Sequence, residues 1–377
     1  MKTKLIIFAL IATLTGCVNQ AQAQNQSCQE LYDTSPQSAI VICQNELAQN
    51  SNNVKLQFYL AVAYDLEENY TQAIEWYTKS ANQGYAEAQY NLGVMYYNGH
   101  GIKQDYQKAF EWHSKSASQG FAQAQNNLGL MYVYGQSVKQ DYTKAFEWFT
   151  KSAGQGFANA QFALGVMYEK GYGVRQDYIK AFEWYSKSAS QGFAEAQNNL
   201  GLMYVYGQSV KQDYTKAFEW FTKSAGQGFA NAQFALGVMY EKGYGVRQDY
   251  IKAFEWYSKS ASQGFAEAQN NLGLMYVYGQ SVKQDYTKAF EWFTKSAGQG
   301  FANAQFALGV MYEKGYGVRQ DYQKAFEWYT KSANQGYGIA QFALGVMYHN
   351  GQGVKQDLDT AKLWFAKTCE NGYDLAC

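Results

Sequence analysis

The stretch AEAQYNLGVMYYNGHGIKQDYQKAFEWHSKSASQG, residues 86–120, decides the fold because it returns along the chain at a fixed step. All nine tryptophans stand 36 residues apart, and a glycine recurs at the same step from Gly84 to Gly372. A sequence period of roughly 20 to 50 residues is typical of a solenoid, in which each unit contacts its neighbours. The period therefore outweighs chain length, which alone would suggest several globular domains.

Each unit is predicted to hold two helices, which we call helix A and helix B. In helix A, about residues 86–97, apolar residues recur every three or four positions from Ala88 to Tyr96 and define one buried face. A glycine-rich loop follows. Asp105 is a good N-cap for helix B, and Gly120 is expected to end that helix in a left-handed conformation. The predicted fold class is all-α, an αα-hairpin solenoid wound as a right-handed superhelix.

The units are similar to the Sel1-like repeat, a relative of the tetratricopeptide repeat. Eight such units are predicted in residues 85–372, whereas residues 53–84 have a shorter turn between their helices and resemble a tetratricopeptide repeat. The resemblance implies a scaffold that binds other proteins, with helix A lining the concave surface. The residues that carry it in the first of the eight units are Ala86, Ala88, Gln89, Leu92, Gly93, Tyr96, Ile102, Ala109, Trp112 and Ala117.

Residues 1–24 are predicted to be a targeting segment, because a basic start precedes an apolar run too short to cross a bilayer. Two cleavage sites compete. Residues 14–17, Leu-Thr-Gly-Cys, resemble the lipobox of bacterial lipoproteins, and residues 21–23 fit ordinary secretion. The lipobox is favoured since it directly follows the apolar run. It implies an acylated Cys17 and an outer-membrane lipoprotein facing the periplasm, with a soluble periplasmic or extracellular protein as the alternative.

Both ends of the repeat array are predicted to carry caps. Residues 25–52 are interpreted as capping helices, the second of which opens with Ser35 as N-cap and Pro36, and residues 373–377 form a C-terminal cap. Either cleavage leaves four cysteines, an even number for an oxidising compartment. A metal-binding or catalytic thiol is the less favoured interpretation of either pair. The predicted disulfides are Cys28–Cys43 and Cys369–Cys377.

The 36-residue units also repeat in pairs, as blocks of 72 residues. Residues 118–189 and 190–261 differ at a single position, and residues 262–333 repeat the block again. Inside the block one unit reads AQNNLGLMYVYGQSV and the other AQFALGVMYEKGYGV. Positions that differ between the two are expected to face away from the core and to decorate the helix A surface. These predicted partner-binding residues are Asn126, Asn127, Val133, Tyr134, Phe162, Glu169 and Lys170, with the copies Asn198, Asn199, Tyr206, Phe234, Tyr278 and Phe306.

Nothing in the sequence predicts catalysis, a cofactor or a metal site. Lysine plus arginine and aspartate plus glutamate balance at 31 each, which argues against nucleic acid as a partner and leaves membrane contact to the lipid anchor. The three histidines, His100 in a loop, His113 in helix B and His349 at a loop start, are scattered. Glu111 and Lys115 are expected to form a surface ion pair. The protein is expected to be a monomer.

The predicted function is a non-enzymatic protein–protein interaction scaffold of the bacterial cell envelope. Two alternatives stay open. Secreted cysteine-rich members of the family imply a penicillin-binding or β-lactamase-type protein, although this chain lacks a Ser-x-x-Lys motif and has a cysteine pair in one repeat only. A glycan such as peptidoglycan is the second alternative, because aromatic rings stack on sugars. The tyrosines at variable positions that could serve either a peptide or a glycan are Tyr97, Tyr134, Tyr206 and Tyr278.

Overall fold

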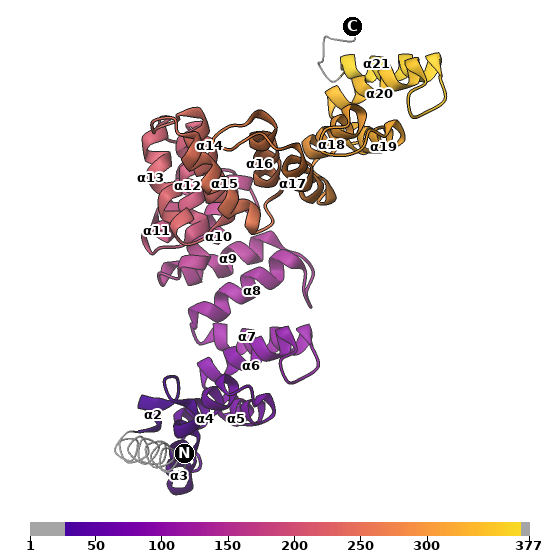
Figure 1. Cartoon of the computed structure of the whole chain (residues 1–377). Helices are drawn as coiled ribbons and strands as arrows, with labels where there is room; N and C mark the ends of the chain where they lie inside the picture. The colour runs from indigo at the N-terminus through magenta and orange to yellow at the C-terminus, as the bar shows by residue number, and fades with distance from the viewer. Residues whose placement is uncertain (1–26, 371–377) are drawn as a thin grey trace, which may run out of the picture. The chain divides into compact units, whose positions relative to one another are not determined.

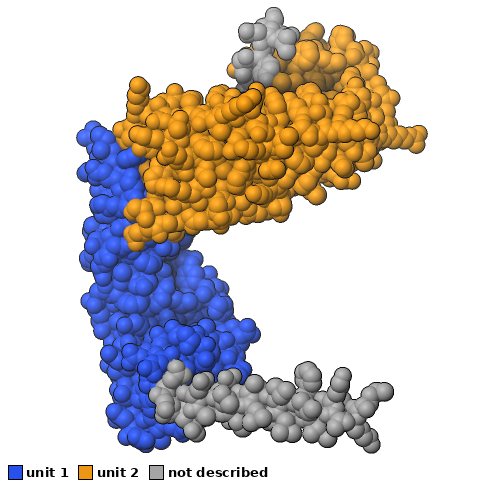
Figure 2. Space-filling view, turned by 60° about the vertical axis from the view of Figure 1, so that its left-hand side comes forward, with its two compact units in different colours: residues 1–188 blue, residues 189–377 orange. Residues whose placement is uncertain are grey.

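The computed structural model describes residues 27–370, which form helices and connecting turns with no strand among them. The chain divides into two compact units, residues 1–188 and 189–377 (Figure 2). The boundary falls inside helix α11 (Tyr178–Ser190). Each unit is a row of helical hairpins, which confirms the predicted αα-hairpin solenoid.

In the first unit, each helix from α2 to α10 packs against the next (Figure 1). The four-residue α2 and the 14-residue α3 precede a series of paired helices of nearly equal length. Their bounds are α2 (Cys28–Leu31), α3 (Pro36–Gln49), α4 (Val54–Leu66), α5 (Tyr70–Asn82), α6 (Ala86–Asn98), α7 (Tyr106–Ser118), α8 (Ala122–Tyr134), α9 (Tyr142–Gly154) and α10 (Ala158–Lys170).

In the second unit, each helix from α12 to α21 again packs against its successor. The even-numbered helices are the predicted helices A, and the odd-numbered helices are the predicted helices B. Their bounds are α12 (Ala194–Tyr206), α13 (Tyr214–Gly226), α14 (Ala230–Lys242), α15 (Tyr250–Ser262), α16 (Ala266–Tyr278), α17 (Tyr286–Gly298), α18 (Ala302–Lys314), α19 (Tyr322–Ala333), α20 (Gly338–Asn350) and α21 (Leu358–Glu370).

The ends of the helices follow from local sequence. Helix α6 ends at Gly99, whose φ of 76° lies in the left-handed region that glycine adopts without a steric cost. The carboxylate of Asp105 accepts a hydrogen bond from the backbone N–H of Lys108 at 3.0 Å and caps α7, as predicted. Gly120 follows α7 with a φ of 92°, also as predicted.

The core of each repeat depends on a glycine in helix A that lets a helix B ring approach closely. A Cβ added to Gly129 of α8 would lie 2.6 Å from Cε1 of Phe149 of α9, closer than atoms can pack. His113 and Tyr185 are buried rings that occupy the same place against Gly93 and Gly165. The recurring Leu-Gly pair of the sequence is therefore explained by the contact between helix A and helix B.

Buried polar side chains connect the two helices of a repeat and also connect neighbouring repeats. Gln89 Nε2 of α6 donates to the carbonyl of Ala81 in the preceding repeat at 3.0 Å, and its Oε1 accepts from Gln119 Nε2 at 2.7 Å. Ser116 Oγ donates to the carbonyl of Ala86 at 2.7 Å. These bonds recur along the array and satisfy polar groups that would otherwise be buried without partners. The Ala-x-Ala-Gln start of each unit thus serves the contact between hairpins.

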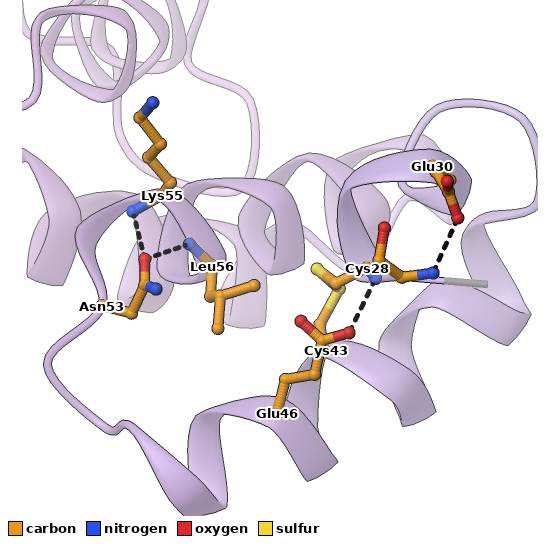
Figure 3. The surroundings of a disulfide bond; sticks show 8 residues. Cys28, Glu30, Cys43, Glu46, Asn53, Lys55 and Leu56 are labelled. Carbon is orange, nitrogen blue, oxygen red and sulfur yellow. Dashed lines mark hydrogen bonds between the residues drawn. A yellow bond between two sulfur atoms is a disulfide. The ribbon is translucent and has the colours of Figure 1, made fainter. Parts of the chain in front are cut away.

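The N-terminal cap contains a disulfide between Cys28 and Cys43, as predicted (Figure 3). The backbone N–H of Cys28 donates to Oε1 of Glu46 at 3.0 Å, so α2 is held on α3 by a hydrogen bond as well. Pro36 is the first residue of α3, although the side chain of Ser35 makes no capping bond. The predicted lipid site Cys17 and the predicted disulfide partner Cys377 lie outside the described residues, and both stay predictions.

Two local predictions are wrong. Glu111 accepts a hydrogen bond from Gln107 at 3.2 Å, and Lys115 Nζ lies 4.0 Å from the ring centroid of Trp112, so these described side chains do not form the expected ion pair. A cation over an indole face is an alternative to an exposed ion pair of similar small energy. His349 does not start a loop but lies in the last turn of α20.

Candidate partner-binding groove

The variable helix A positions do not all face away from the core. Asn126 is only 6% exposed, and its copies Asn198 and Asn270 are equally buried, so the prediction that these residues decorate an open surface is wrong. The amide of Asn126 donates to Oδ1 of Asn127 at 3.5 Å. Tyr134 lies at the opposite extreme with 66% of its surface exposed. The predicted set therefore contains both internal and surface residues.

The alternation between Val133 and Glu169 follows the ring that each faces on helix B. In α11 that ring is Tyr185, and its hydroxyl donates to Oε2 of Glu169 at 2.6 Å. In α9 it is Phe149, and Val133 packs against the core cluster that contains this ring. The rule holds in the later blocks too, where Tyr257 donates to Glu241 at 2.6 Å. A carboxylate stands in helix A where helix B supplies a hydroxyl.

The alternation between asparagine and alanine, as in Asn127 and Ala163, has a related cause. Asn91 Nδ2 donates at 3.0 Å to the hydroxyl of Tyr77 on the preceding helix B, and Asn271 hydrogen-bonds the hydroxyl of Tyr257. Ala163 instead follows Phe149, which has no hydroxyl. Two repeats depart from the rule, because His113, which has no hydroxyl, is followed by Asn127, and Tyr329 is followed by Ala343. Much of the sequence variation in helix A thus matches polar rings with polar partners.

These networks set the charge of the helix A surface. Burial first, and then the hydrogen bond from its hydroxyl to Glu241, raise the pKa of Tyr257, which keeps the phenol neutral. In the first unit, Glu169 also accepts from Lys170 Nζ at 2.6 Å. That hydrogen bond and the charge of Glu169 raise the pKa of Lys170. The Glu-Lys pair predicted as a binding feature is therefore largely neutralised within the chain.

An apolar groove lies on the helix A surface of the second unit, and we call it the helix A groove. It encloses about 270 Å³ between α16 and α18, the helices A of two consecutive repeats. Both helices lie in the orange part of the chain (Figure 1). No charged side chain is among the residues that line it. These residues are Asn270, Leu274, Val277, Tyr278, Tyr286, Phe293, Asn303, Phe306, Ala307, Val310, Met311, Tyr316 and Tyr337.

Two predicted residues line this groove, Tyr278 from α16 and Phe306 from α18. Tyr278 is 68% exposed, so most of its ring is available to a ligand. The groove also contains a pair that was not predicted, Tyr286 and Tyr316, whose rings stack with centroids 4.8 Å apart. Tyr316 alternates with Gln280 in the loop after helix A, and this alternation was the signal that could have identified it.

Three other ring-bearing residues singled out in the sequence, Tyr97, His100 and His113, do not line the groove. The hydroxyl of Tyr97 donates a hydrogen bond to Oε1 of Gln136 at 2.8 Å, and the ring of Tyr97 makes an edge contact with the ring of Tyr106. His113 is fully buried and has no hydrogen-bond partner on either ring nitrogen. His100 stacks on Tyr70 with ring centroids 5.8 Å apart. None of these three residues lies at the groove.

Among residues 27–370, no three His, Cys, Asp or Glu side chains are grouped so that they could hold a metal ion. Within the same residues, the helices fall short of the length and apolar character that crossing a membrane requires. Both statements concern the described part of the chain.

Comparison with known proteins agrees with the fold. The family model described as Sel1 repeat matches nine consecutive segments, including the first hairpin, in which the sequence resembles a tetratricopeptide repeat. No curated protein matches the chain. The matched segments are residues 54–85, 86–121, 122–157, 158–193, 194–229, 230–265, 266–301, 302–337 and 338–373.

Two solved structures are similar over most of the chain. One is c5321, a protective antigen present in uropathogenic Escherichia coli strains that displays an SLR fold, with 34% identity, a TM-score of 0.54, and 88% of each chain covered. The other is a Sel1 repeat protein from Oxalobacter formigenes, with 34% identity, a TM-score of 0.60, and 80% of this chain and 87% of that chain covered.

Proposed function

Since the chain belongs to the Sel1 repeat family, we propose that it is a protein-binding scaffold of the bacterial cell envelope that holds a peptide segment of its partner in the helix A groove. Repeat arrays of this kind present extended surfaces built from successive helices, and they bind proteins through them. The observation that carries the proposal is the groove itself, an apolar hollow lined by helix A and flanked by exposed aromatic rings.

The chemistry of the groove favours a peptide with large apolar side chains. Leu274, Val310 and Phe306 supply aliphatic and aromatic walls. The tyrosine hydroxyls and the side chain of Asn303 supply a few polar groups to orient the peptide backbone. An exposed ring such as Tyr278 gains when a partner covers it, because apolar surface is then removed from water.

A place outside the cytoplasm is supported by separate observations. The disulfide between Cys28 and Cys43 is typical of oxidising compartments. A structural relative of the chain is a protective antigen, which agrees with a location outside the cytoplasm. The lipobox resemblance at Cys17 adds the proposed anchor in the outer membrane.

Site-specific photo-crosslinking in the native bacterium tests the proposal. A photoreactive amino acid at Tyr278 is expected to trap a defined partner protein, and adding Phe306→Ala is expected to reduce the yield. Ile251 is the matched control, because it is 65% exposed in the same unit but lies on helix B. Identical crosslinked products from Tyr278 and Ile251 would contradict a groove-based interaction.

The stacked tyrosines also support the glycan alternative, since parallel aromatic rings can bind sugars. Under that alternative, purified protein should sediment with isolated peptidoglycan, and Tyr286→Ala should abolish the sedimentation. Catalysis is not proposed. Turnover of a chromogenic cephalosporin by purified protein would contradict that position.

A further inference from the structure

All but one of the side chains of the helix A groove occur three times in the chain at steps of 72 residues, the exception being Tyr337, whose place is taken by Phe265 and Phe193. The groove residues Leu274, Tyr278 and Phe306 have copies at Leu202, Tyr206 and Phe234, and again in the first block. Duplication accounts for the identity of the copies, but it does not change the physical consequence. A ligand that fits one groove therefore meets the same side chains at all three positions, apart from the tyrosine hydroxyl that Phe265 and Phe193 lack.

The structure gives the three positions the same local geometry. Tyr134, Tyr206 and Tyr278 are 66, 69 and 68% exposed. The tyrosine stack repeats as well. Its ring centroids are 4.8 Å apart for Tyr142–Tyr172, 4.9 Å for Tyr214–Tyr244 and 4.8 Å for Tyr286–Tyr316. Within each stack the two rings are nearly parallel, with interplanar angles of 16°, 17° and 15°.

The electrostatics of the groove define the chemistry of what it binds. Its lining carries no charged group, and the neighbouring Glu313 and Lys314 neutralise each other at 2.6 Å. A charged side chain placed in the groove would lose its hydration without gaining a partner. The matching segment is therefore an uncharged peptide with aliphatic or aromatic anchors.

We propose that the partner carries this uncharged apolar segment in several copies, and that one chain binds at least two copies at once. The inference rests on the proposed function, because it assumes that the helix A groove is the binding site. Two grooves in one folded unit hold the second segment at a high effective concentration once the first is bound. Linked binding of this kind raises the apparent affinity by roughly 10²- to 10⁴-fold without any new contact.

The probe is a peptide selected by display on the full chain, with counter-selection against a variant that carries Tyr134→Asp, Tyr206→Asp and Tyr278→Asp. These three tyrosines are mostly exposed, so the substitutions leave the core intact, and circular dichroism checks the fold. The peptide is made as a single copy and as two copies joined by flexible linkers of graded length. Calorimetry then gives the stoichiometry and affinity of each.

The expected result is three single-copy peptides bound per chain, and a two-copy probe that binds about 100-fold tighter or more at the best linker length. A chain with Tyr134→Asp and Tyr206→Asp should keep single-copy binding at one site and lose the gain. Single-copy binding at one site in the unmodified chain, or no gain at any linker length, would overturn the multivalent inference alone. Failure to obtain any peptide that distinguishes the chain from the triple variant would overturn the proposed function and this inference with it.

Discussion

His113 makes the stability of the first unit depend on pH, and replacing it should remove that dependence. The imidazole is fully buried against Gly93, and neither ring nitrogen has a hydrogen-bond partner. Tyr90 lies 5.5 Å away between ring centroids and carries no charge that would stabilise an imidazolium. Burial therefore lowers the pKa of His113 from 6.5 to about 4.

The sign and size of the effect follow from linkage. A histidine whose pKa is lower in the folded state binds its proton more readily when the chain unfolds, so stability is lost as the pH falls through 6.5. At pH 5 the unfolded side chain is almost fully protonated and the folded one is mostly neutral. The loss relative to pH 8 is about 2 kcal/mol. The neutral imidazole also leaves a buried N–H unsatisfied, which costs a further ~1–3 kcal/mol at every pH.

The substitution His113→Phe tests this reasoning, because Phe149 shows that a phenyl ring fits the same place against Gly129. Urea unfolding followed by tryptophan fluorescence gives the free energy of unfolding of both proteins at pH 8 and pH 5. The variant should be more stable at pH 8, and its advantage should grow by about 2 kcal/mol at pH 5. The reciprocal variant Phe149→His should gain the same pH dependence. An advantage of His113→Phe that is equal at the two pH values would refute the argument.

Three further predictions concern other features of the chain. Tyr257→Phe leaves Glu241 and Asn271 without their hydroxyl partner and should lower the free energy of urea unfolding by ~1.5–3 kcal/mol. Adding Glu241→Val and Asn271→Ala should recover most of the loss, because valine and alanine occupy these places in the repeats whose helix B ring is Phe. No recovery in the triple variant would contradict the matched-pair explanation. Ser137 has a φ of 65°, so Ser137→Gly should be more stable than Ser137→Ala by ~1–2 kcal/mol in thermal unfolding, and equal stabilities would show that the turn is not strained. A fatty-acid analogue fed to the bacterium should label the protein but not its Cys17→Ala variant, and labelling of both would exclude the lipobox reading.

The candidate site was only partly predictable. Comparing the two kinds of unit singled out Tyr278 and Phe306, which line the groove. The same comparison also selected Asn126 and Glu169, which have internal partners. A residue varies between copies either because it faces a ligand or because the side chain it contacts has also changed. The two causes give the same pattern of variation in the sequence. They cannot be separated there, because Tyr185, the ring that Glu169 contacts, lies 16 residues away on another helix.

The sequence by itself determined the repeat, the paired helices and their ends. The reason is that these features depend on local chemistry, such as the Asp105 cap and the left-handed glycine at position 99, and on a period that neighbouring units share. Only the tertiary structure decided which side chains are left for a partner. Tyr185 satisfies Glu169, whereas Tyr278 keeps 68% of its surface exposed, and this difference arises from contacts between neighbouring helices rather than within one helix.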